Sequence, residues 1–132
     1  MSSDKQASTT PMVASCHCNR VRLTLPAVPT ELNECHCTLC YKYGAVWAYF
    51  TRNEVRISVA EDTKIEAYVR ADSDGGNISF NRCSNCGCMT HWWGLGEKYG
   101  GPEMKMGVNC RLVPEREIFG IERRISPGPK SS

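Results

Sequence analysis

Positions 83–88 hold the sequence CSNCGC, the stretch on which the fold prediction depends most. A Cys-x-x-Cys-Gly turn places two sulfur atoms along one edge of a tetrahedral metal site and can direct backbone N–H groups at them. Gly87 favours this turn, because glycine adopts a positive φ without steric cost. Two sulfurs cannot close a tetrahedral site, so Cys83 and Cys86 need two further ligands from another part of the chain.

The tripeptide Cys16-His17-Cys18 offers this second pair of sulfurs. In an extended segment the side chains i and i+2 point to the same side, so the two cysteines can meet one metal while His17 points away. We therefore predict a closed zinc site formed by Cys16, Cys18, Cys83 and Cys86. A structural zinc of this kind contributes roughly 10–16 kcal/mol of apparent binding free energy near neutral pH, which is comparable to the stability of a whole domain.

A third cluster, CHCTLC, occupies positions 35–40. Two of its cysteines share a face by the same alternation, and a turn through residues 38–39 can bring in the third. Three protein ligands with a vacant fourth position are typical of a catalytic zinc. Three thiolates favour a soft fourth ligand such as a substrate thiolate, which is deprotonated at pH 7 and placed to attack a carbonyl. We predict a second, catalytic zinc held by Cys35, Cys37 and Cys40.

The cysteine pattern leaves other arrangements open. A fourth protein ligand would make the second zinc structural as well, and the candidates are Cys88, Cys110, His36 and His91. Cys88 could instead replace Cys86, because it lies two residues further along the chain. A buried apolar role is the simpler interpretation of Cys110, and a structural role that of His91. The aromatic residues near the clusters are predicted to be core rather than a binding platform: Trp47, Tyr49, Phe50, Trp92 and Trp93.

The length and composition favour one small domain. We place it at residues 13–125 of 132, between a disordered tail at 1–12 and a flexible tail at 126–132. No apolar run could span a membrane and no secretory signal is evident at the N-terminus, so we expect a reducing, cytoplasmic location. Nine cysteines in such a compartment are typical of metal ligands rather than disulfides. The net charge of +2 falls to about −1 once seven thiolates bind two Zn²⁺, which disfavours nucleic acid as a partner.

The hydropathy pattern between the clusters is mainly that of β-strands. Alternating apolar and polar residues predict strands at 21–25 and 55–59, and a further strand follows at 65–69. A continuous apolar run predicts a strand covered on both faces at 45–50. The remaining strands are expected at 78–80, 89–93, 104–108 and 118–121, with a turn at 74–77. No window of eleven residues has a convincing helical period, so the fold class is mainly β.

The stretch from Cys16 to about Val113 resembles the glutathione-dependent formaldehyde-activating enzyme (GFA) family, which includes the centromere protein V proteins. The resemblance lies in the opening Cys-His-Cys, the CHCTLC cluster before an aromatic strand, and the distant Cys-x-x-Cys-Gly. It implies a small two-sheet β-sandwich of the Mss4-like type, stabilised by zinc. It also implies that the four-cysteine set binds a structural zinc and the three-cysteine set a catalytic one. Cys88 is an extra thiol that the family pattern does not require.

The family's reaction adds glutathione to formaldehyde to give S-hydroxymethylglutathione. The leading hypothesis is therefore a zinc-dependent carbon–sulfur lyase that joins or cleaves the adduct of a glutathione-like thiol and a small aldehyde. The alternative is a non-catalytic zinc-binding interaction module, and a third hypothesis is a thiol redox protein that uses Cys86 and Cys88 or the second cluster. No glutathione-recognition segment can be matched beyond the metal ligands, and the oligomeric state is not predicted.

Overall fold

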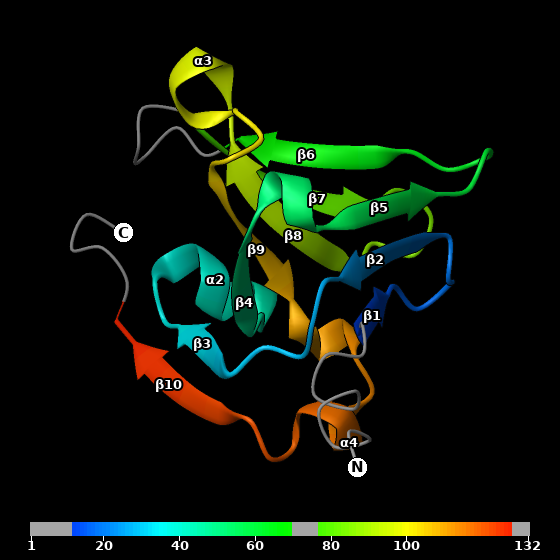
Figure 1. Cartoon of the computed structure of the whole chain (residues 1–132). Helices are drawn as coiled ribbons and strands as arrows, with labels where there is room; N and C mark the ends of the chain where they lie inside the picture. The colour runs from blue at the N-terminus through cyan, green and yellow to red at the C-terminus, as the bar shows by residue number, and fades with distance from the viewer. Residues whose placement is uncertain (1–11, 70–76, 128–132) are drawn as a thin grey trace, which may run out of the picture.

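The computed structural model describes residues 12–69 and 77–127, which form a mainly β fold of two sheets (Figure 1). A three-stranded sheet has the order β1-β2-β5, and a seven-stranded sheet has the order β10-β3-β4-β9-β8-β7-β6. The strands are β1 (Met12–Ser15), β2 (Val21–Leu25), β3 (Glu31–Cys35), β4 (Trp47–Thr51), β5 (Arg56–Val59), β6 (Ile65–Val69), β7 (Ile78–Cys83), β8 (Met89–Gly94), β9 (Lys105–Asn109) and β10 (Glu122–Ser126). The helical segments are α2 (Thr38–Tyr43), η1 (Arg52–Glu54), α3 (Gly96–Tyr99), η3 (Cys110–Leu112) and α4 (Glu115–Ile118).

The two sheets pack face to face because alternate residues of β1 and β2 are apolar. Val21, Leu23 and Leu25 are fully buried, and they join Met106 and Val108 of β9 in one core cluster. Burying one such side chain stabilises the fold by about 1.5–3 kcal/mol. This cluster lies between the three-stranded sheet and one face of the seven-stranded sheet, and we call it the inner core.

The opposite face of the seven-stranded sheet carries α2 and a second cluster of buried residues. Strand β4 separates the two faces, since Val46 and Ala48 point into the inner core while Trp47 joins Cys37 and Cys40 on the other side. In Figure 1, α2 and β2 accordingly lie on opposite sides of β4. The apolar run at 45–50 therefore belongs to a strand with side chains packed on both of its faces. We call the second side the α2 face.

Most strands predicted from the sequence are present. The segments 21–25 and 65–69 coincide with β2 and β6, and 45–50, 55–59, 89–93 and 104–108 lie within two residues of β4, β5, β8 and β9. Strand β7 extends three residues beyond the predicted 78–80. Of the turn predicted at 74–77, residues 74–76 lie outside the described residues.

The strand predicted at 118–121 is wrong. Ile118 ends the helix α4, and the Ile121 N–H donates to the Ile118 carbonyl at 3.1 Å, which is the hydrogen bond of a tight turn. The strand of this region, β10, begins only at Glu122 and pairs in parallel with β3. Two apolar residues three positions apart suit one helical turn as well as a short strand, and here the turn is formed.

The expected tails overlap the sheet ends. Met12 is the first residue of β1 and Ser126 is the last of β10, whereas residues 1–11 and 128–132 lie outside the part of the chain that the structure describes. Within residues 12–69 and 77–127, no helix has the length and apolar character required to cross a membrane.

Candidate metal centres

The first centre gathers four cysteines from two distant parts of the chain. The sulfur atoms of this four-cysteine centre all lie within 4.8 Å of one another, and they belong to Cys16, Cys18, Cys83 and Cys86. The Cys18 sulfur is 3.6 Å from that of Cys16 and 3.6 Å from that of Cys83. Four sulfurs at this spacing form a donor set that could hold a soft, tetrahedral metal ion such as Zn²⁺.

The N-terminal pair lies in the turn between β1 and β2, and not in an extended segment as the sequence suggested. The Asn19 N–H donates to the Cys16 carbonyl at 2.9 Å, and Asn19 takes the left-handed conformation with φ 65°. This conformation is one that asparagine tolerates better than most residues. The turn, rather than strand alternation, brings the two sulfurs together and exposes His17.

The second pair lies in the turn between β7 and β8. The Gly87 N–H donates to the Cys83 carbonyl at 2.9 Å, and Gly87 has φ 81°, in agreement with the expected glycine turn. Backbone N–H groups point at two of the sulfurs, because Asn85 donates to Cys83 Sγ at 3.3 Å and Val21 donates to Cys16 Sγ at 3.3 Å. Such donors stabilise thiolate charge.

The thiols of this centre differ in acidity. Burial raises the pKa of Cys16 to about 12, whereas a hydrogen bond from the Asn85 side chain lowers the pKa of Cys18 to about 5. Neighbouring thiolates repel one another, so one ionised sulfur makes the next harder to ionise. A divalent cation removes this conflict, which is a further reason to regard the centre as a metal site.

The second centre is local in sequence. Its three sulfurs, of Cys35, Cys37 and Cys40, also lie within 4.8 Å of one another. Cys35 ends β3, and Cys37 caps the N-terminus of α2, where its sulfur accepts the Cys40 N–H at 3.2 Å. Gly44 ends the helix in the left-handed conformation with φ 69°. The sequence predicted a turn at 38–39, and the structure extends it into the short helix α2.

The three-cysteine centre is largely buried, since its three cysteines form a buried group even though Cys35, taken as a whole residue, is less enclosed than the other two. Cys37 and Cys40 are buried, while Cys35 is only partly buried. Burial raises the pKa of Cys40, although the indole of Trp47 beside it acts in the opposite direction. Burial is the largest single influence on Cys37 and acts to raise its pKa, but hydrogen bonds from Cys40, Leu39 and Cys35 together outweigh it and the pKa is lowered. Cys35 is therefore the least enclosed of the three residues.

None of the four candidates for a fourth ligand joins the three-cysteine centre. Among the described residues, no His, Cys, Asp or Glu other than the three cysteines belongs to the group. His36 instead lies 2.8 Å from Glu34, and Cys110 is fully buried in the inner core, where burial raises its pKa to about 12. Cys88 lies beside the first centre, where its thiol interacts with that of Cys86.

His91 is buried away from the three-cysteine centre. Its ring packs edge-on against Trp93, a residue of the inner-core side, with ring centroids 4.5 Å apart. The Thr90 hydroxyl donates to the Asn81 carbonyl, so it must accept from His91 Nδ1, which lies 2.7 Å away. Burial and the nearby Arg52 lower the pKa of His91 to about 4. These observations describe a neutral, buried histidine away from the three-cysteine centre. Its Nε2 has no hydrogen-bond partner in the described part of the chain, so it is not the fully satisfied structural histidine that the sequence favoured.

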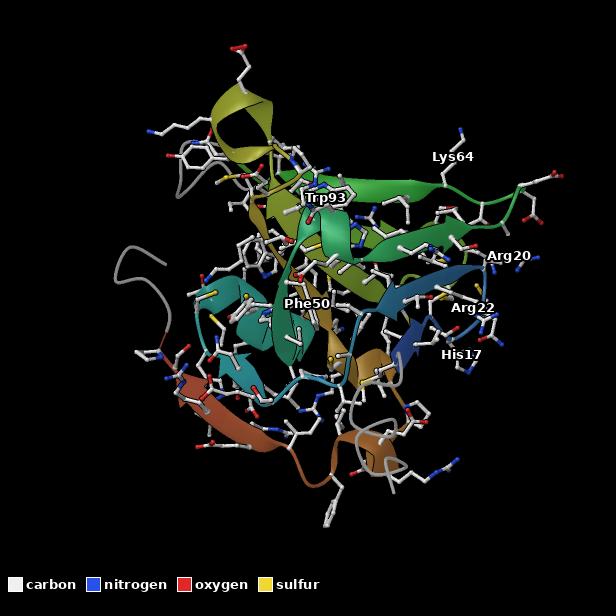
Figure 2. The ribbon with its side chains drawn as sticks, in the orientation of Figure 1. His17, Arg20, Arg22, Phe50, Lys64 and Trp93 are labelled. Carbon is white, nitrogen blue, oxygen red and sulfur yellow. The ribbon has the colours of Figure 1, made fainter. Side chains whose placement is uncertain are left out.

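The aromatic residues do not all behave as core. Trp47 is 1% exposed, and Phe50 and Trp93 pack against the inner core; the latter two lie within the ribbon in Figure 2, where Arg20 and Lys64 project outward. Tyr49 is 39% exposed, so its assignment to the core is wrong. No signal within the segment indicated this exposure, because Tyr49 follows Trp47 by two residues and alternation gives both side chains the same face.

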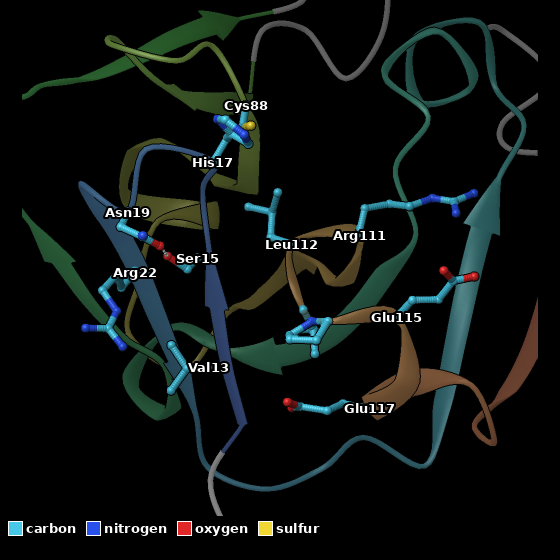
Figure 3. Close-up of a pocket in the computed structure, with 12 residues that line it drawn as sticks. Val13, Ser15, His17, Asn19, Arg22, Cys88, Arg111, Leu112, Glu115 and Glu117 are labelled. Atoms are coloured by element: carbon cyan, nitrogen blue, oxygen red, sulfur yellow. Dashed lines mark hydrogen bonds between the residues drawn. The ribbon is translucent and has the colours of Figure 1, made fainter.

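An open groove of about 840 Å³ lies beside the first centre rather than the second (Figure 3). The residues that line it include His17, Arg22, Cys88, Arg111 and Leu112. The sequence did not predict this groove, because its walls come from segments that only the tertiary structure brings together. It is separate from the three-cysteine centre.

Fold and sites together define a small two-sheet β protein with two candidate metal centres built from cysteine sulfur. A family model described as glutathione-dependent formaldehyde-activating enzyme matches residues 11–119, and the chain therefore belongs to that family. The fold is similar to the crystal structure of a Rhodobacter sphaeroides protein, with a TM-score of 0.63, 21% identity, and coverage of 86% of this chain and 100% of the other. The search of curated proteins gave no significant match.

Proposed function

We propose that this chain is a zinc-dependent carbon–sulfur lyase that joins or cleaves the adduct of a glutathione-like thiol and a formaldehyde-like aldehyde. The observation that carries the proposal is the three-cysteine centre, which has three sulfurs within 4.8 Å and no fourth protein ligand among residues 12–69 and 77–127. The family description names the same two reactants. We place the activity in residues 13–125 and in a reducing, cytoplasmic compartment, where the nine thiols stay reduced.

The two centres would hold zinc in different ways. In the proposal Cys16, Cys18, Cys83 and Cys86 close a structural site, and Cys35, Cys37 and Cys40 hold a catalytic ion with one position free. Thiolate donors suit Zn²⁺ and not hard cations such as Mg²⁺. A zinc ion at the second centre would supply an open position at which a substrate thiol loses its proton near neutral pH.

The protein groups around the three-cysteine centre support such chemistry. Trp47 and Phe80 pack with Cys37 and Cys40 on the α2 face, so one side of the sulfur cluster is shielded from water. Cys35 lies at the end of β3 and is the least enclosed of the three cysteines, so in the proposal the small thiol approaches from that side. A site that is dry on one side strengthens the electrostatic interactions formed within it.

The test is a rate measurement on zinc-loaded protein. Glutathione and formaldehyde are mixed, and S-hydroxymethylglutathione formation is followed by exchange NMR with the parent chain, with Cys37→Ser and with Cys110→Ala as the matched control. We expect acceleration by the parent and the control, and none by Cys37→Ser. Two bound zinc ions without acceleration would contradict the lyase proposal and support the non-catalytic zinc module.

A further inference from the structure

A tyrosine hydroxyl lies on the α2 face near the three-cysteine centre. Strands β3 and β4 pair with Asn33 opposite Trp47, and alternation places Cys35 on the same face as Asn33 and Tyr49 on the same face as Trp47. The contact between Asn33 and the Tyr49 hydroxyl shows that these two sets share one face. The Tyr49 side chain therefore extends from β4 across the sheet to β3, the strand that ends in Cys35.

The hydroxyl of Tyr49 is held by one hydrogen bond that leaves its proton unused. Asn33 Nδ2 donates to the Tyr49 oxygen at 2.6 Å, and an amide nitrogen can only donate. No hydrogen bond donated by the Tyr49 O–H is found among the described residues. Asn33 Oδ1 is buried and lacks a partner as well. Because Asn33 Oδ1 is enclosed and Tyr49 is 39% exposed, the Tyr49 O–H is the donor left to meet a ligand oxygen.

The ring that carries this hydroxyl is fixed in place. The Trp92 ring meets the Tyr49 ring edge-on with centroids 6.1 Å apart, and Lys105 Nζ lies 4.6 Å above the Tyr49 ring. Trp92 in turn covers Gly107, where a Cβ atom would lie 2.2 Å from the indole nitrogen. Since only glycine permits this close approach, β9 holds Trp92 against Tyr49. A pre-oriented side chain loses little entropy when it contacts a ligand.

The surroundings also keep the hydroxyl protonated. Burial raises the pKa of Tyr49, the Asn33 hydrogen bond opposes this, and negative charge at Cys35 and Cys40 raises the pKa further. The influence of these two sulfurs is consistent with the position of the hydroxyl near the three-cysteine centre.

We propose that Tyr49 is a catalytic residue of the proposed lyase reaction, in which its hydroxyl donates a proton to the carbonyl oxygen of the aldehyde and Asn33 positions that hydroxyl. The inference rests on the proposed function. In the step, the thiolate sulfur forms a bond to the carbonyl carbon and the π pair of the C=O bond moves to oxygen. That oxygen takes the proton of Tyr49, and the phenolate is reprotonated by solvent.

The kinetic test uses Tyr49→Phe, with Tyr68→Phe as the matched control, because Tyr68 is 47% exposed on β6 at the far edge of the same sheet. Zinc content and the KM for the thiol should equal those of the parent in both variants. A general acid contributes typically 10²–10⁴-fold, so kcat should fall by about that factor in Tyr49→Phe and stay within roughly twofold in Tyr68→Phe. A Tyr49→Phe variant within about threefold of an active parent overturns the proposal.

A second measurement does not depend on turnover. The five tyrosines are replaced by 3-fluorotyrosine, and the ¹⁹F signal of Tyr49 is identified as the one missing in Tyr49→Phe. Glutathione alone and formaldehyde alone should leave this signal in place, whereas the two together should shift it, because only the adduct carries a hydroxymethyl oxygen next to the thiol sulfur. A shift in a protein that gives no rate acceleration supports the Tyr49 contact and rejects the lyase function. No shift with the adduct present overturns the Tyr49 proposal, whether or not the parent is active.

Discussion

The four-cysteine and three-cysteine centres use the same ligand atom and differ in how much chain they enclose. In the first centre, Cys18 and Cys83 are 65 residues apart and their sulfurs are 3.6 Å apart. In the second centre all three cysteines fall within residues 35–40, on one strand end and one short helix. A link between distant residues removes far more freedom from the unfolded chain than a local one does. The long-range centre therefore suits a structural role, and the local centre can be changed by chemistry at its metal position without loosening the fold.

Replacement of Cys83 by serine should have the largest effect on folding, because it opens the four-cysteine centre. We expect the variant to lose cooperative thermal unfolding and dispersed NMR signals, because a structural zinc contributes roughly 10–16 kcal/mol and a domain has only about 5–15 kcal/mol of stability. Circular dichroism and NMR provide the measurement, and Cys88→Ser is the matched control in the same turn. A folded, cooperative Cys83→Ser protein would contradict the structural role of the four-cysteine centre.

Replacement of Cys37 by serine should separate the two centres. The variant is expected to stay folded, to lose one of two bound zinc ions and to lose all lyase activity, because only the local site is broken. Zinc content by elemental analysis and thermal unfolding of the same sample test this. If Cys37→Ser unfolds to the same extent as Cys83→Ser, both centres are structural and the asymmetry is rejected.

Acid should lower the free energy of unfolding through His91, which packs on the inner-core side of the molecule. The pKa of His91 is lowered from 6.5 to about 4 in the folded state. Between these two pH values the His91 ring is protonated in the unfolded state and neutral in the folded state. The contribution of His91 to the free energy of unfolding is therefore fully present above about pH 6.5. It is lost as the pH falls toward 4, and the loss amounts to roughly 3 kcal/mol.

Denaturant unfolding of the parent and of His91→Gln between pH 4 and 7 isolates this contribution, since both proteins keep the same metal ligands. The pH dependence should be shallower in the variant. Parallel curves for the two proteins would show that His91 does not carry the effect.

A methyl group at Gly107 should disturb the α2 face alone. Gly107→Ala places the new carbon against the Trp92 indole and should destabilise the fold by about 1–3 kcal/mol, the usual range for overpacking. Both zinc ions should remain bound, while lyase activity falls because Trp92 no longer holds Tyr49. Gly120→Ala is the matched control, since no atom lies within 4 Å of a Cβ at that position. Equal activity in the two variants would show that Gly107 does not help to position the site.

Local chemistry in the sequence explains why much of this architecture was predictable. Cysteine spacing grouped the same sulfurs that the structure brings together, because few residue types bind metals and a tetrahedral site limits their number. Strand β2 followed from strict alternation, which reflects burial on one face only. The grouping succeeded although Cys16 and Cys18 lie in a turn, since a turn and a strand can both place residues i and i+2 on one side.

Features that depend on distant partners were not predictable. Strand β10 pairs with β3, so that Arg124 contacts Glu31 across 93 residues, and its own sequence has no alternation because all but the last of its residues are exposed. The partial exposure of Tyr49 likewise follows from its position on a sheet face whose neighbours come from β3 and β9. Pattern within one segment carries no information on which strand will lie beside it.

The parallel pairing of β10 with β3 has a consequence for biosynthesis. The Ser126 carbonyl accepts the N–H of His36 at 2.7 Å, so the last residue of β10 holds the backbone between Cys35 and Cys37. During vectorial synthesis the four-cysteine centre can close once residue 86 has left the ribosome. The backbone of the three-cysteine centre gains its outer strand only after about forty further residues, which is several seconds at common elongation rates. The nascent chain can thus assemble the four-cysteine centre before β10 pairs with the backbone of the three-cysteine centre.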